Sequence, residues 1–169
     1  PHRGLDCGIG AFLFLTTAAI VIWQNSRLGV LWDLSFILEN SHRISVGDVP
    51  YRDFPFPYAP LTFLAQAGII KLTGRVFWHH IVYCAVVGGL GTVLTWRILL
   101  NQLRDAISSS RLVAFLLAVP LTILGIYSIY PHPFYDPDCT FVILICILLL
   151  QRLEQLRFPA LPSFFTGAL

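Results

Sequence analysis

The side chains of this sequence best suited to chemistry are carboxylates, and two short segments hold most of the candidates. One segment, Y-P-H-P-F-Y-D-P-D-C-T over residues 130–140, places Asp136 and Asp138 on either side of Pro137. Two carboxylates presented so rigidly can bind a cation, accept hydrogen bonds from a sugar hydroxyl or act as a general base. His132 lies nearby, but one histidine and two carboxylates do not specify a metal. Alternatively, Asp138 only caps the helix that follows it.

The other segment begins at Asp33. Residues 32–46 predict a helix that lies along a membrane interface, because Gly47 is suited to end it and its apolar residues can face lipid or protein. Asp33 falls in the first turn, where an acid also stabilises the helix dipole, and Glu39 follows further along. Asp33 therefore has both a chemical and a purely structural interpretation.

A proline-rich and aromatic stretch comes next, G-D-V-P-Y-R-D-F-P-F-P-Y-A-P-L over residues 47–61. Its four prolines exclude a continuous helix and favour a stiff, extended path. Such a stretch is typical of an interfacial anchor, and it can also line a groove for a lipid-linked substrate. Arg52 and Asp53 can simply pair with each other, which contributes under about 1 kcal/mol in an exposed position.

These segments belong to a chain that is too apolar for a soluble domain. Of its 169 residues, 56% are hydrophobic and 12% are charged, and its mean hydropathy is +0.74. Soluble domains carry about 25% charged residues, so we expect an integral membrane protein. The net charge of +2 is too small to indicate a nucleic acid as a partner. The first residue is not Met, and we expect the chain to be part of a longer polytopic protein.

The apolar stretches predict an all-α fold, a polytopic transmembrane helical bundle over residues 1–169. Spans are expected over about 8–24, 78–100, 112–130 (kinked at Pro120) and 138–153. Residues 59–73 hold an apolar run too short to cross a bilayer, which indicates a second interfacial helix within an outer loop over residues 25–77.

Positive charge selects the orientation of these spans. If residues 59–73 do not cross, Arg97, Arg104 and Arg111 fall in short inner segments, as the positive-inside rule requires. The loops 25–77 and 131–138 then share the outer side. Six of the nine acids are gathered there: Asp33, Glu39, Asp48, Asp53, Asp136 and Asp138.

Three motifs in this order resemble a known family: P-Y-R-D-F over residues 50–54, K-L-T-G over residues 71–74 and P-H-P-F-Y-D-P-D over residues 131–138. The sequence resembles the N-terminal half of the membrane module of GT-C glycosyltransferases, and among them the bacterial and archaeal protein mannosyltransferase and aminoarabinose transferase-like enzymes. The resemblance covers nearly the whole chain. It departs from the family at Asp33-Leu34, where the family more often has two adjacent acids.

The resemblance implies an enzyme of a prokaryotic plasma membrane, with its active site on the outer side. Its donor would be a polyprenyl-phosphate-linked sugar, and its acceptor a protein, a lipid or a polysaccharide. Asp33 is implied as the catalytic acid of the first loop, and Asp136 or Asp138 as that of the second. The substrate-binding candidates are Glu39, Tyr51, Arg52, Asp53 and His132. No cofactor and no metal ligand set is specified, although a divalent cation is compatible with the acids.

The alternative is a membrane protein without enzymatic activity, either a piece of a transporter or an inactive transferase-like scaffold. Acids in a transporter would be ion sites, and ionisable residues inside the membrane mark such pathways. No expected span holds an acid in its interior. This disfavours the transporter but not the scaffold.

Overall fold

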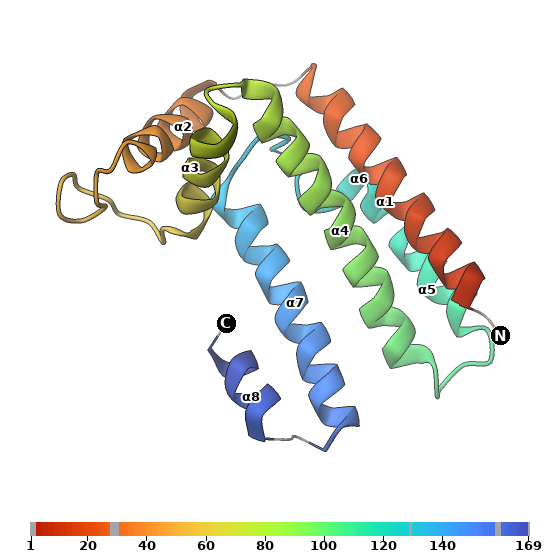
Figure 1. The fold of residues 1–169 in the computed structure, drawn as a ribbon. Helices are drawn as coiled ribbons and strands as arrows, with labels where there is room; N and C mark the ends of the chain where they lie inside the picture. Colours follow the sequence, from red (N-terminus) through yellow and green to blue (C-terminus); the bar gives the residue numbers. More distant parts are fainter. Residues whose placement is uncertain (1–2, 28–30, 129, 158–159, 169) are drawn as a thin grey trace.

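The computed structural model describes residues 3–27, 31–128, 130–157 and 160–168, and this part of the chain is all-helical, without a strand (Figure 1). The elements in order are α1 (Arg3–Asn25), α2 (Leu31–Ser45), α3 (Leu61–Thr73), α4 (Phe77–Leu103), α5 (Ser110–Ala118), α6 (Leu121–Leu124), α7 (Tyr135–Gln155) and α8 (Ala160–Gly167). The all-α prediction is therefore confirmed.

The long helices α1 and α4 run antiparallel and pack closely against each other (Figure 1). Thr17 of α1 and Thr92 of α4 form a buried hydrogen bond of 3.1 Å between their hydroxyls. Gly89 allows the close approach, because a Cβ atom there would lie 2.7 Å from the Phe14 ring. Small residues and hydroxyl pairs at a helix contact are typical of helices that associate in lipid.

Within the described ranges, two helices are long and apolar enough to cross a membrane, Gly4–Asn25 and Phe77–Leu103. The expected span 138–153 corresponds to α7, which is 21 residues long and has two acids in its first turn and Arg152 in its last. Residues 59–73 form α3, whose 13 residues extend about 20 Å at 1.5 Å per residue, less than a bilayer core of about 30 Å.

The expected kinked span 112–130 is much less helical than the sequence indicates. Helix α5 ends at Ala118, and α6 is a single turn beginning after Pro120. Pro120 has no N–H group to donate to the preceding turn. Thr122 and Ile123 then form tighter hydrogen bonds three residues back, to Val119 at 3.0 Å and to Pro120 at 3.1 Å. Gly125 then adopts an extended backbone, and no further helix begins before Tyr135.

Both acidic segments lie at the same end of the long helices (Figure 1). There α2 and α3 pack together, and one apolar cluster joins them to the segment before α7; it contains Ile37, Phe54, Phe56, Phe63 and Phe134. The Asn25 side chain at the end of α1 also donates a hydrogen bond to the Pro131 carbonyl. The aromatic side chains of the first loop thus pack the second loop against α2.

Candidate functional site

The candidate site lies where the first turn of α2 faces the segment before α7. The half-buried carboxylate of Asp33 is near enough for its negative charge to act on both the His132 ring and the Tyr135 hydroxyl. The Asp136 charge acts on the same hydroxyl. Neither Asp33 nor Asp136 forms an ion pair with a basic residue among those described. The fold therefore brings together two unpaired carboxylates, one from each acidic segment.

His132, one of the substrate-binding candidates from the sequence, is the most deeply buried member of this group. Its side chain is 1% exposed, and neither ring nitrogen has a hydrogen-bond partner in the described part of the chain. The rings of Tyr130 and Phe134 flank it at centroid distances of 5.8 and 6.3 Å. Burial lowers the pKa of the imidazole, and the Asp33 charge only partly opposes this shift. The free donor and the free acceptor of this ring face the protein interior and are not accessible to a ligand in this conformation.

The two acids of the second segment occupy different environments. Asp138 is 5% exposed and accepts hydrogen bonds of 2.6 Å from both the Thr62 and the Tyr127 hydroxyls. It thereby joins α3, α7 and the segment before α7. Asp136 is exposed on the first turn of α7. Asp138 is therefore held as a structural link, whereas Asp136 is accessible to a ligand.

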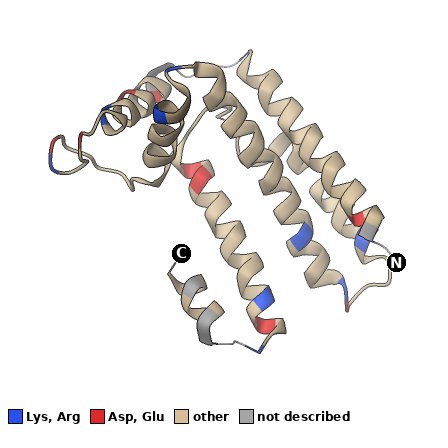
Figure 2. Ribbon diagram, in the orientation of Figure 1, with Lys and Arg blue, Asp and Glu red and all other residues tan. Residues whose placement is uncertain are grey.

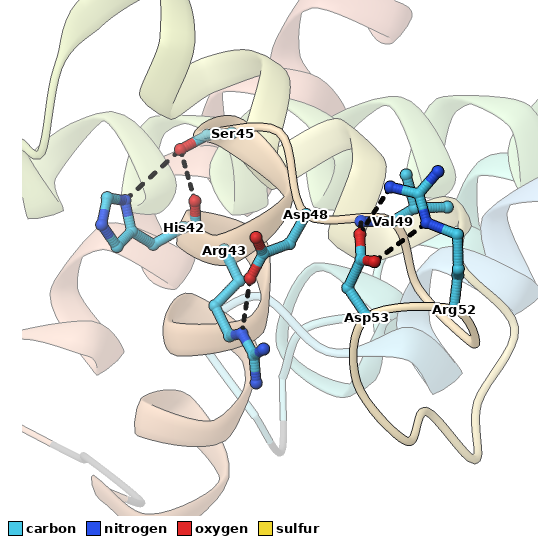
Figure 3. A network of polar contacts seen from close by, with 7 residues as sticks. All are labelled: His42, Arg43, Ser45, Asp48, Val49, Arg52 and Asp53. Atoms are coloured by element: carbon cyan, nitrogen blue, oxygen red, sulfur yellow. Dashed lines mark hydrogen bonds and ion pairs between the residues drawn. The ribbon is translucent and has the colours of Figure 1, made fainter.

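Arg52 and Asp53 form an ion pair with each other in the loop after α2 (Figure 3). The Arg52 guanidinium donates to both carboxylate oxygens at 2.9 and 2.8 Å, and the Val49 N–H donates to the same carboxylate at 2.7 Å. These hydrogen bonds, the one from Arg52 first, lower the pKa of Asp53 to about 2. Tyr51 donates to the Tyr58 carbonyl. All three candidates are exposed and are engaged within their own loop.

Glu39 lies elsewhere on α2, at a groove of about 700 Å³ between α2, the end of α3 and the start of α4. Its walls include Phe36, Ile70 and Phe77, and its polar groups include His42 and Arg75, whose side chains contact each other. The sequence analysis did not select His42 or Arg75. The one available signal was spacing, because residues 39 and 42 share a helix face.

The described residues hold no group of three or more His, Cys, Asp or Glu side chains that could bind a metal ion. No family model matches the chain, and neither a curated protein nor a solved structure shows significant similarity to it. Any function must accordingly be argued from the site itself.

Proposed function

We propose that this chain is part of a membrane glycosyltransferase that moves a sugar from a polyprenyl-phosphate carrier to an acceptor hydroxyl. The observation that carries the proposal is the packing of α2 against the segment before α7, through Ile37 and Phe134 of one apolar cluster. This packing brings the first turns of α2 and α7, which hold Asp33 and Asp136, to the same end of the helices (Figure 1). The two segments are about 100 residues apart in sequence and contribute an unpaired carboxylate each. Their grouping supports a shared role for the two loops that the sequence resemblance to GT-C enzymes implies.

Membrane insertion is supported by the apolar side chains that the helices leave exposed. The most apolar window of α1 is 17% buried within the structure, and large side chains such as Phe12, Leu15 and Trp23 are more than half exposed. Exposed apolar surface of this extent is suited to contact with lipid rather than water. In Figure 2 the charged residues avoid the middle of the long helices and gather toward their ends.

The charge difference between the ends supports an orientation. Arginines outnumber acids where α4 and α7 end: Arg97, Arg104, Arg111, Arg152 and Arg157 stand against Asp6, Asp105 and Glu154. At the other end six acids stand against five bases, and these bases are spread over the long segment from Arg27 to Arg75. Because the positive-inside rule counts Lys and Arg close to the ends of spans, the arginine-rich end would face the cytoplasm and Asp33 would lie on the outer side.

In the proposed reaction, Asp33 is the general base. The acceptor oxygen forms a bond to the anomeric carbon, and its proton passes to the Asp33 carboxylate. The bond between that carbon and the phosphate oxygen breaks, and its electron pair leaves with the polyprenyl phosphate. Positive charge develops on the sugar ring, where Asp136 would stabilise it.

The groove beside Glu39 offers a place for the carrier. Phe36 lies one turn after Asp33 on α2 and forms part of the groove wall. An isoprenoid chain would lie between Phe36, Ile70 and Phe77. His42, which lines the same groove, follows Asp33 by nine residues and therefore lies on the opposite face of α2. The groove would accordingly hold the apolar tail of the carrier and not the reacting phosphate.

The test is Asp33→Asn in the full-length protein, reconstituted with a polyprenyl-phosphate sugar and assayed for transfer. Loss of a general base is expected to lower kcat by about 10²- to 10⁴-fold, while the amide keeps the size of the side chain. Asp105→Asn is the matched control, because it removes an exposed acid from the opposite end. Near-normal turnover by Asp33→Asn, with the protein still inserted in the membrane, would refute the assignment.

A further inference from the structure

A second hollow lies at the opposite end of the molecule from Asp33, between the C-terminal ends of α4 and α7. It measures about 200 Å³ and is lined by Arg97, Asn101, Arg104, Leu148, Arg152, Gln155 and Leu156. Three of these side chains are guanidinium groups, contributed by two different helices. The positive-inside rule accounts for arginines near this end, but not for three of them around one hollow.

Few acidic side chains neutralise the positive charge of the arginines in this hollow. Arg97 lies 3.9 Å from Asp6, whose carboxylate is bound more closely by Arg111 at 2.9 Å. Neither Arg104 nor Arg152 forms an ion pair with any acid in the part of the chain that the structure describes. The cluster therefore holds a clear excess of positive charge.

The helix ends do not cancel this excess. Two helix C-termini contribute about −0.5 of a charge each, against three full positive charges. Of the two neutral polar side chains in the lining, Asn101 and Gln155, the first is occupied, because it donates to the Gln151 side chain at 3.0 Å. The remaining donors of the hollow are mainly guanidinium N–H groups, which match the oxygens of a phosphate in pairs.

We propose that this hollow binds the phosphate of an anionic membrane lipid, such as phosphatidylglycerol. Leu148 and Leu156 form the apolar part of its lining. Acyl chains lying along α7 would cover these side chains while the phosphate meets the arginines. Basic pockets between membrane helices on the cytoplasmic side bind lipid headgroups in this way. The proposal requires membrane insertion, but it does not require sugar transfer.

The experiment measures the melting temperature of the detergent-purified full-length protein during titration with phosphatidylglycerol, phosphatidylcholine or inorganic phosphate. Phosphatidylglycerol is expected to raise Tm and phosphatidylcholine to leave it unchanged, because a ligand that binds the folded state stabilises it. In Arg104→Gln/Arg152→Gln the apparent affinity should fall at least tenfold. Lys71→Gln/Arg157→Gln removes the same charge outside the hollow and should respond like the wild type.

Two results would overturn the proposal. An undiminished response of Arg104→Gln/Arg152→Gln would show that the lipid binds elsewhere, and an equal Tm shift with inorganic phosphate would assign the hollow to a soluble anion. If the glutamine variant does not fold, Arg104→Lys/Arg152→Lys keeps the charge and loses the paired geometry. Its affinity is then expected to fall severalfold, and wild-type affinity would refute the arginine site.

Discussion

At the residue scale, the acids Asp136 and Asp138 are close in sequence, but one is exposed and the other is buried. Asp136 and Asp138 are two positions apart on the first turn of α7, so their side chains point to different sides of the helix. Asp138 points inward to two hydroxyls, and Asp136 is exposed. A base or a ligand-binding acid must be accessible, which favours Asp136 as the partner of Asp33 in the proposed reaction.

This difference predicts opposite effects on stability. Asp138→Ala leaves the buried Thr62 and Tyr127 hydroxyls without their acceptor, and we expect it to lower the free energy of unfolding by about 2 kcal/mol or more. Asp136→Ala removes an exposed side chain and should change it by less than about 0.5 kcal/mol. Denaturant titration of both variants in detergent checks this. Equal losses would contradict the structural role of Asp138.

At the scale of the elements, close packing of α1 on α4 sets the frame in which the site is built. Gly89 faces Phe14, with a Cβ position 2.7 Å from the ring and 3.0 Å from the Phe14 carbonyl oxygen. The ring could turn away from a larger residue, but the backbone oxygen could move only with α1. The glycine is thus required by the distance between the helices and not by an unusual backbone angle.

We therefore expect Gly89→Ala to destabilise the protein by about 1–3 kcal/mol, the usual cost of overpacking. Gly8→Ala is its control on α1, because a Cβ atom there meets nothing within 4 Å. Alanine has the higher helix propensity, so the control should be neutral or slightly stabilising. Thermal unfolding followed by circular dichroism compares the two. A stable Gly89→Ala variant would show that α1 and α4 lie further apart.

At the scale of the whole molecule, both acidic segments lie at one end and the arginine cluster lies at the other. The short α3 is the reason, because it stays beside α2 and leads into α4 at the same end of the molecule, so that α4 runs antiparallel to α1 (Figure 1). In the proposed orientation a single bilayer separates the sugar-transfer site from the lipid-binding hollow.

Cysteine labelling tests this arrangement in sealed vesicles. The chain would first have its native cysteines replaced by alanine: Cys7, Cys84, Cys139 and Cys146. Single cysteines at the half-buried Asp48 and the exposed Asp136 should then react with an impermeant reagent from the same side, and one at the exposed Ser108 from the opposite side. Reaction of positions 48 and 136 from different sides would contradict the topology.

The sequence alone determined the helical fold class and the approximate positions of α1, α2, α3, α4 and α7, because apolar runs and their breakers act locally. It was misleading over residues 112–130, where Pro120 and Gly125 interrupt a run whose composition favours a span. Only the tertiary structure decided that His132 is buried without a partner and that Asp138 is bound from two elements. Burial and pairing depend on residues distant in the chain, and no local pattern specifies which of them will meet.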